Sequence, residues 1–262
     1  SGFAVQTTYH KYEDSYENHL EFTTDENGKY TYIQDISAPH LIFIQPRPST
    51  KFIRDNTTGG DCSSIGIWNS SSKTCTLTAN LTGQTIQIDN NDITLDGNGY
   101  TLTGSGTGIG VYLFEKAGVT IKNLKIMQFT YGIYLYYSTQ NNITNNTISN
   151  NTYGIYLTGR WYCSWGCYWQ NISNNLIYHN NFINNTTQAT VNHGVNNLFD
   201  LASPVGGNYW NNWISPDTNN DGFVDNSYFF SGGQDNLPWT KENGWLEVPP
   251  PQNLVKNPGF EE

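Results

Sequence analysis

The chain of 262 residues carries few charged side chains, and most of these are acidic. Charged residues make up 13% of it, and its formal net charge at pH 7 is −10. Binding to a nucleic-acid backbone requires a basic stripe, whereas the 12 Lys and Arg residues are scattered along the sequence. No apolar run reaches the length of a membrane-spanning helix. We therefore expect neither a nucleic-acid partner nor a membrane span.

Residues 1–55 lack the repeat that follows and are predicted to form an N-terminal arm or cap. Two runs, at 30–36 and 41–44, are rich in β-branched and aromatic residues, which is typical of strands. The chain starts with Ser1 and has no signal-like apolar core, so Ser1 is expected to be the terminus of a mature, exported protein.

Residues 56–200 contain a repeat with a step of 22 residues. Gly-Val-Tyr-Leu at 110–113 returns as Gly-Ile-Tyr-Leu at 132–135 and at 154–157, and Ile121 recurs as Ile143. This step, together with β-branched residues, Asn and Gly, indicates one coil of a parallel β-helix, because helical repeats need about 33 residues or more. Each coil leaves an apolar face that only the next coil can bury, so the fold is expected to be an all-β solenoid.

Asparagines at matching places in the coils predict a buried ladder of side-chain amides. Asn123 and Asn145 are one step apart, and Asn174 is placed one coil later. Amides stacked along the axis can bond one another, as in cross-β structures.

An aromatic insertion interrupts the coils between Ile143 and Ile172, which are 29 residues apart, about seven more than one step. Its tryptophans are candidates for stacking on sugar rings or for contacting a protein partner, because aromatic side chains bury a large area at low entropic cost. Covering the core from a loop is the alternative. These candidate contact residues are Trp161, Trp165 and Trp169.

The four cysteines form two pairs that are local in sequence. Cys62 and Cys75 precede the coils, and Cys163 and Cys167 lie in the aromatic insertion. A zinc site would show Cys-x2-Cys knuckles or accompanying His, and neither is present. We therefore predict two disulfides, which are typical of an exported protein.

Nine Asn-x-Ser/Thr sequons are present, and they favour N-linked glycans on an exported protein. An Asn- and Thr-rich β-helix also produces such triplets by chance. Asn145 is expected to be unmodified, because a buried ladder amide is inaccessible. The remaining candidate glycosylation sites are Asn56, Asn69, Asn80, Asn142, Asn150, Asn171, Asn184 and Asn185.

Residues 201–247 are predicted to close the solenoid around a calcium loop. From Asp217 onward, oxygen-bearing residues occur at alternate positions with Gly222 at the sixth, a pattern that lets a short loop surround one hard cation. Tyr228, at the twelfth position, is not acidic, so a ligand must come from elsewhere. A polar surface turn is the alternative. The candidate calcium ligands are Asp217, Asn219, Asp221, Phe223, Asp225 and Asp235.

Residues 248–262 contain a proline linker at 249–251 and a terminal segment that is predicted to form a strand.

The chain resembles the NosD-like right-handed parallel β-helix repeat proteins, which are secreted and cell-surface proteins of archaea and bacteria. The resemblance is carried by residues 91–102, the coils, residues 177–185, and the closing motifs Gly-Gly-Asn-Tyr-Trp at 206–210 and Asp-Asn-Leu-Pro-Trp at 235–239. It extends over residues 60–240 and implies a right-handed parallel β-helix that is secreted, extracellular or attached to the cell surface.

Three hypotheses for function follow. The first is a non-enzymatic, glycosylated filament or sheath subunit, in which a terminal strand adds to the next copy and side chains such as Leu41 and Phe43, or Leu254 and Phe260, set the register. The second is a monomeric carbohydrate-binding or adhesive module that uses the aromatic insertion. The third is a polysaccharide lyase or hydrolase, but the coils are poor in paired carboxylates and in basic residues.

The family name suggests copper handling, yet copper carriers cluster Met, His or Cys. This chain has one Met and five dispersed His, so no copper site is expected.

Overall fold

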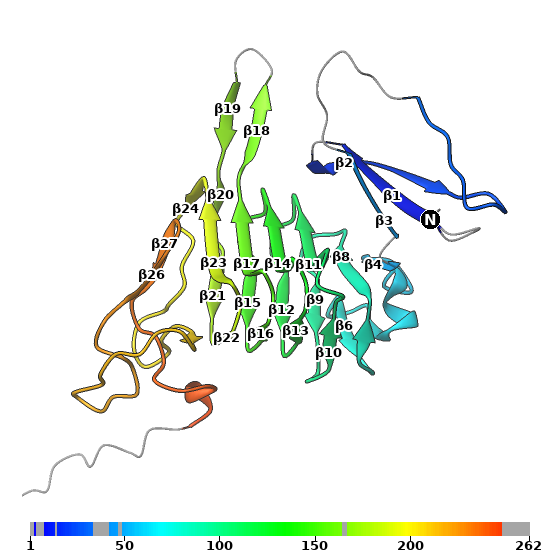
Figure 1. Cartoon of the computed structure of the whole chain (residues 1–262). Coiled ribbons are helices and arrows are strands. Elements are labelled where there is room, and N and C mark those ends of the chain that lie inside the picture. Colours follow the sequence, from blue (N-terminus) through cyan, green and yellow to red (C-terminus); the bar gives the residue numbers. More distant parts are fainter. Residues whose placement is uncertain are drawn as a thin grey trace, which may run out of the picture. The chain divides into compact units, whose positions relative to one another are not determined.

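The computed structural model describes residue 3 and residues 8–13, 15–33, 42–46, 49–163 and 167–247. The chain forms two compact units, Ser1–Thr50 and Lys51–Glu262 (Figure 1). The boundary lies a few residues earlier than the predicted one at residue 55, because β4 (Ser49–Ile53) is already a strand of a solenoid sheet. The linker and strand predicted at 248–262 lie outside the described residues.

The N-terminal unit contains a three-stranded antiparallel sheet in the order β2-β1-β3. Its strands are β1 (Thr8–Glu13), β2 (Ser15–Thr23) and β3 (Ile42–Pro46). Tyr9 and Phe22 are buried and stack on each other, with ring centroids 5.7 Å apart. The strand predicted at 41–44 is confirmed from Ile42 onward. The one predicted at 30–36 is wrong for residues 30–33, since Tyr30 is not in a strand and its ring stacks on Phe22.

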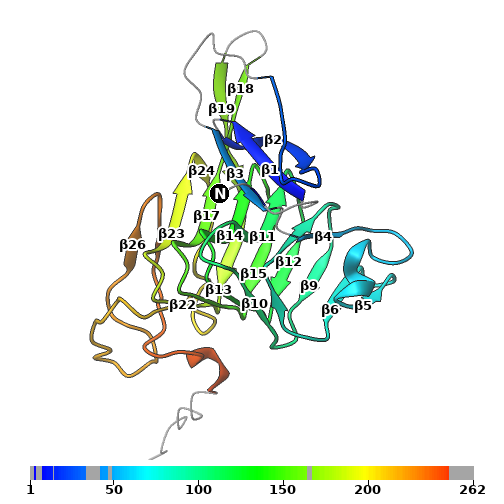
Figure 2. The ribbon, with the colours of Figure 1, turned by 45° about the vertical axis from the view of Figure 1, so that its right-hand side comes forward.

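The second unit is a solenoid of three six-stranded sheets (Figures 1 and 2). Sheet 1 contains β4, β8 (Gln84–Ile88), β11 (Ile109–Phe114), β14 (Tyr131–Tyr136), β17 (Tyr153–Thr158) and β23 (Thr187–Asn192). Sheet 2 contains β5 (Gly66–Asn69), β6 (Thr74–Leu77), β9 (Thr94–Asp96), β12 (Thr120–Lys122), β15 (Asn142–Thr144) and β21 (Leu176–Tyr178). Sheet 3 contains β7 (Leu81–Thr82), β10 (Thr101–Thr103), β13 (Lys125–Met127), β16 (Thr147–Ser149), β22 (Asn181–Ile183) and β25 (Tyr209–Trp210).

The remaining elements are short. They are η1 (Asp61–Ser64), β18 (Arg160–Cys163), β19 (Cys167–Gln170), β20 (Ile172–Ser173), β24 (Gly194–Val195), β26 (Tyr228–Phe230), β27 (Gly233–Asp235) and η2 (Gly244–Leu246). Neither 3-10 helix is long enough to cross a membrane, and the described residues contain no other helix.

The predicted parallel β-helix is confirmed, and its register follows the 22-residue step. Parallel pairing places Leu113 beside Leu135, and Leu135 beside Leu157. All three side chains are fully buried. Pairing of identical apolar positions from coil to coil keeps every inward side chain on the core face, because a shift by one residue would turn each of them outward. The hydrophobic core is therefore one continuous column.

The aromatic insertion is longer than predicted. Ile143 pairs with Ile177, not with Ile172, so this coil takes 34 residues instead of 22. The extra residues form the antiparallel hairpin β18–β19 and the short strand β20, which pairs with β24 outside the three main sheets.

Buried asparagines occupy each of the three corners of the coil and bond along the axis. At the corner between sheets 2 and 3, the Nδ2 of Asn146 donates to the Oδ1 of Asn180 at 3.0 Å, and the Nδ2 of Asn180 donates to the Oδ1 of Asn208 at 3.0 Å. All three side chains are fully buried. The other two corners contain the pairs Asn141 with Asn175 and Asn151 with Asn185.

The amide ladder exists, but Asn123, Asn145 and Asn174 do not form it. The ladder member beside Asn145 is Asn146, the residue after Asn123 is Leu124, and Asn174 precedes Asn175 at a different corner, between sheets 1 and 2. Asn123, Asn145 and Asn174 have left-handed backbone, with φ of 55°, 56° and 58°, and Asn145 and Asn174 are exposed. A residue in this conformation turns the chain sharply, so the next residue points inward. The ladder at the corner of Asn145 is thus built by Asn146.

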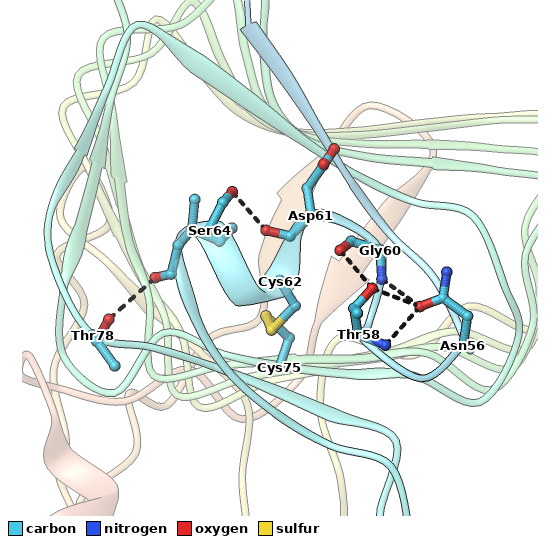
Figure 3. The surroundings of a disulfide bond; sticks show 9 residues. Asn56, Thr58, Gly60, Asp61, Cys62, Ser64, Cys75 and Thr78 are labelled. Atoms are coloured by element: carbon cyan, nitrogen blue, oxygen red, sulfur yellow. Dashed lines mark hydrogen bonds between the residues drawn. A yellow bond between two sulfur atoms is a disulfide. The ribbon is translucent and has the colours of Figure 1, made fainter.

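The first coil is closed by a disulfide, whose surroundings are drawn in Figure 3, and by an antiparallel strand. The predicted bond between Cys62 and Cys75 is present, with an S–S distance of 2.02 Å, and both side chains are fully buried. Cys62 lies in η1 and Cys75 in β6, so the bond joins the covering turn to sheet 2. β5 then pairs antiparallel with β6 as the outermost strand of that sheet.

Aromatic rings of the closing segment cover the last coil. Trp210 is buried and stacks on Phe182 of β22, with ring centroids 4.3 Å apart, and on Tyr228 at 4.4 Å. Phe230 lies 5.6 Å from the same indole. These rings cover the apolar face of the last coil, which a further coil would otherwise bury.

Asp235 is a structural acceptor inside this closing segment, so its predicted role as a calcium ligand is corrected. Its side chain is fully buried. One carboxylate oxygen accepts the backbone N–H of Asn208 at 2.7 Å and the indole N–H of Trp210 at 2.8 Å, while the other accepts the N–H of Leu237 at 3.1 Å. Burial raises the pKa of Asp235 to about 7, although these donors favour the ionised form.

The raised pKa makes stability depend on pH. Because the folded state binds the proton of Asp235 more tightly than the unfolded state, this carboxyl stabilises the fold fully below about pH 4, and the stabilisation is lost as the pH rises to about 7. The slope is at most about 1.4 kcal/mol per pH unit. Denaturant unfolding between pH 4 and 8 should show this loss, and Asp235→Asn should lack it. Identical pH profiles for the two proteins would refute the assignment.

Candidate functional site

The hairpin β18–β19 carries exposed aromatic rings and projects beyond the coils (Figure 1). It leaves the corner between sheets 1 and 2. Trp161 and Tyr168 are each 52% exposed, and Trp169 is 42% exposed. Because these rings are exposed, they do not cover the core, and the alternative role of the insertion as a cap is wrong for these residues. Trp165 lies outside the described residues.

Contacts at the base hold the hairpin in place. The guanidinium of Arg160 lies over the ring of Tyr137, 4.5 Å from its centroid, and forms an ion pair with Glu115. Its Nη2 donates to the Oε1 of Gln170 at 2.7 Å, which joins the two strands. A half-buried arginine with these partners fixes the direction in which the hairpin leaves the coil.

The predicted disulfide at the tip, Cys163–Cys167, is also present, with a Cα–Cα distance of 4.1 Å. No described cysteine is free. At the other end, the ring of Trp169 stacks on His193 at 3.7 Å and an interplanar angle of 10°. The hairpin is therefore held against the coils at its base and its two strands are joined at its tip, which preorganises its exposed rings.

A column of half-buried tyrosines lies on the outer face of sheet 1. Tyr112, Tyr134 and Tyr156 occupy the same position in successive coils, with neighbouring ring centroids 5.4 Å apart. Burial raises the pKa of Tyr156, whose hydroxyl accepts a bond from Asn192. The sequence repeat shows that these tyrosines recur every 22 residues. That their side chains point outward is known only from the strand pairing in the structure.

The loop at 217–225 is closed by its own side chains. The carboxylate of Asp217 accepts the backbone N–H groups of Asp221 and Gly222, both at 3.1 Å. Asp221 accepts the N–H of Phe223 at 2.9 Å. The hydroxyl of Thr218 donates to Asp225 at 2.9 Å. These are the bonds of a polar turn, and they hold the predicted oxygen ligands near one another.

Most of the predicted glycosylation sites lie on the surface. Asn185 is the exception, because it is buried in the ladder and donates to the carbonyl of Ile148 at 2.8 Å, so glycan attachment there is ruled out. Asn142 is half-buried. Asn145 is exposed, contrary to expectation. The other exposed sites are Asn56, Asn69, Asn80, Asn150, Asn171 and Asn184.

The described residues contain no group of three or more His, Cys, Asp or Glu side chains that is suited to a metal. Asp96 pairs with Lys122 at 3.2 Å and accepts from Asn123 at 3.0 Å. Burial opposes its ionisation, but these bonds lower its pKa. His179 is stacked on Trp245, and burial lowers its pKa. These titratable groups are engaged in structural contacts.

Comparison with curated proteins and with solved structures finds no match. A family model described as periplasmic copper-binding protein (NosD) matches residues 41–214, which is more than half of the chain. The match covers the solenoid from its first strand to the start of the closing segment. The chain therefore belongs to the NosD family of parallel β-helix proteins.

Proposed function

We propose that the protein is a non-enzymatic binding module of the periplasm or cell surface, which attaches to polysaccharide through the hairpin β18–β19. The observation that carries this proposal is the set of exposed rings on a hairpin that is anchored at its base and cross-linked at its tip. Aromatic faces stack on the apolar faces of sugar rings and bury area at low entropic cost. Six surface-exposed sequons beyond Asn145 support a glycosylated, exported chain.

Copper binding, which the family description names, does not fit the donors that the described residues offer. Copper sites use soft or imidazole ligands in groups. The four cysteines form disulfides, and His179 and His193 each stack on a tryptophan. Met127 is the only methionine of the chain. No step of the proposed function involves copper.

An enzymatic role has less support than binding. Glycoside hydrolysis needs two carboxyl groups that face one bond. Asp96 and Asp89 are each paired with a basic residue, Lys122 and Arg54 respectively.

Truncation of an exposed ring should weaken polysaccharide binding. Trp161→Ala is expected to lower affinity about 5- to 10-fold, because a stacked aromatic contact contributes about 1 kcal/mol or slightly more. Affinity electrophoresis in gels that contain soluble glucans, mannans or xylans measures this. Phe229→Ala, which removes a ring that is 67% exposed elsewhere, should have no effect. Equal mobility of Trp161→Ala and wild type in every gel that retards the wild type would overturn the proposal.

We further propose that calcium binds the loop at 217–225. A hollow of about 200 Å³ lies beside the loop, and four of its lining residues, Asn219, Asp221, Asp225 and Asn236, carry side-chain oxygens that support a calcium site. Its other lining residues are Phe223, Val224 and Leu237. Asn236 takes the place that the sequence assigned to Asp235. The carbonyl of Phe223 occupies the position that supplies a main-chain ligand in loops of this pattern.

Calcium should stabilise the wild type but not a variant that lacks a ligand. Calcium at about 100 times its dissociation constant adds about 2.7 kcal/mol to the free energy of unfolding. Asp221→Ala should remove this gain, whereas Glu247→Gln, a change of an exposed carboxylate outside the loop, should retain it. Differential scanning calorimetry of the wild type and both variants, with calcium and with a chelator, measures this difference in stability. No shift in the melting temperature of the wild type excludes the site.

A second candidate function is assembly into a filament or sheath. Both ends of the solenoid are covered by described residues, so assembly would use the N-terminal unit, where β2 and β3 are the outer strands of a small sheet. Outer strands present main-chain groups that a neighbouring copy can pair with. Electron microscopy of the intact chain would then show fibres, and deletion of residues 1–50 would abolish them. A monomeric intact chain at high concentration excludes this candidate.

A further inference from the structure

A polar groove of about 440 Å³ lies at the corner between sheets 2 and 3. Asn98, Asn123 and Asn145, from three successive coils, form one side of it. Lys125 of β13 also lines it. The volume is within the range of small-ligand sites in proteins.

The backbone explains why the three asparagines face the groove. Each has left-handed φ, at 49°, 55° and 56°. After Asn123 and Asn145 the next residue enters the interior, as Leu124 and Asn146 do, whereas Asn98 is followed by Gly99, which is exposed and also has positive φ. The corner residue itself remains at the surface: Asn98 and Asn145 are exposed, and Asn123 is half-buried. Their amides therefore form an outer row parallel to the buried ladder.

The opposite wall comes from the closing segment, which folds back along the coils. Asn243 is fixed to β22 by a reciprocal pair of bonds with Asn181: its backbone N–H donates at 3.0 Å, and its Oδ1 accepts at 2.7 Å. Trp245 stacks on His179 with an interplanar angle of 3°. Residues 181 and 243 are 62 positions apart, so these contacts build the groove and hold Glu242 at its edge.

The chemistry of the lining identifies the class of ligand. A carboxamide carries one acceptor oxygen and two N–H donors, which suits hydroxyl groups that both donate and accept. The amide of Asn123 already donates one N–H to Asp96 at 3.0 Å, which leaves its oxygen and its other N–H for a ligand. One positive charge, on Lys125, and one negative charge, on Glu242, balance each other, so the groove attracts neither polyanions nor polycations. Coils stack about 4.8 Å apart, a spacing close to the length of one sugar residue in an extended glycan.

We propose that this groove binds a neutral saccharide chain running along the solenoid axis, with the amides of Asn98, Asn123 and Asn145 each meeting a successive sugar. The site is separate from the aromatic hairpin. β18 and β19 leave the corner between sheets 1 and 2, at the top of Figure 1, whereas β13 and β16 lie at the bottom. The proposal therefore does not depend on the function assigned to the hairpin.

The test uses the full chain, secreted into the periplasm of a bacterial host that lacks N-glycosylation, so that the disulfides form and Asn145 stays unmodified. Calorimetric titration with cellohexaose, mannohexaose and xylohexaose probes the groove, and hexagalacturonate is the anionic comparison. Asn145→Gly removes an amide without strain, because glycine accepts positive φ. Asn150→Gly is the matched control, since Asn150 is also exposed, has φ of 55° and belongs to a sequon, but lies at another corner.

At least one neutral hexasaccharide is expected to bind, more tightly than hexagalacturonate does. Asn145→Gly should weaken the groove's share of this binding at least 5-fold, and Asn150→Gly should leave it unchanged. Trp161→Ala should lower only the share that belongs to the hairpin and should leave the share that Asn145→Gly weakens. Loss of binding in Trp161→Ala but not in Asn145→Gly would assign all binding to the hairpin and overturn the groove. Absence of binding by every neutral probe, or preference for hexagalacturonate, would overturn it as well.

Discussion

Buried amide ladders hold the coils of this solenoid together at their corners. A sheet satisfies its own backbone groups, but a corner turns N–H groups away from any strand partner. Here the side-chain oxygens of Asn141, Asn146 and Asn151 accept the N–H groups of the coil before, at 2.9 to 3.1 Å. Apolar packing is non-directional, whereas these bonds have a fixed direction and fix the register of each coil on the next.

The ladders also determine how the solenoid ends. The row through Asn146, Asn180 and Asn208 continues to the carboxylate of Asp235, which accepts the N–H of Asn208. Trp210 donates to the same carboxylate while its ring covers the last coil. Asp235 and Trp210 therefore end the solenoid together: Asp235 accepts the last hydrogen bond of the amide ladder, and Trp210 covers the last apolar coil. Because the inward side chains of the coils are buried, the three proposed binding sites, at the hairpin, the closing loop and the corner groove, all lie on the outer surface.

Much of the fold was predictable because a stacked coil imposes its period on the sequence. The recurrence of Ile121 at Ile143 predicted their pairing. At Asn145 the prediction was wrong by one residue because both asparagines of this pair have a role: Asn145 turns the corner and Asn146 faces inward. The pairs at 145–146, 150–151, 174–175 and 184–185 all follow this order, with the first residue at positive φ. The pairs at 141–142 and 180–181 do not, because there Gln140 and His179 turn the corner and the first asparagine faces inward, so the pairs alone do not give the register. Asn174 was assigned to the wrong corner because the insertion hid the true successor of Asn146, which is Asn180.

The sites were less predictable, since they depend on contacts between distant segments. The acidic pattern at 217–225 was visible in the sequence, but the bonds that draw Asp235 into the interior come from Asn208 and Trp210. The groove needs Asn243 to reach Asn181, and no local pattern indicates that contact. The aromatic insertion was recognised from composition. Its length was underestimated because the prediction paired Ile143 with Ile172. Ile172 belongs to the side strand β20, and Ile177 is the residue that pairs with Ile143.

Amide hydrogen exchange tests the central role of the ladders most directly. The N–H of Leu124 donates to the buried Asn146, whereas the N–H of Ser71 donates to Asn69 in an exposed turn. Both bonds join a backbone N–H to an asparagine side chain, so they differ mainly in burial. We predict that Leu124 exchanges far more slowly than Ser71, and that Asn146→Ala accelerates exchange at Leu124 and in the adjoining coils. Exchange at Leu124 as fast as at Ser71, or unchanged in the variant, would contradict this account.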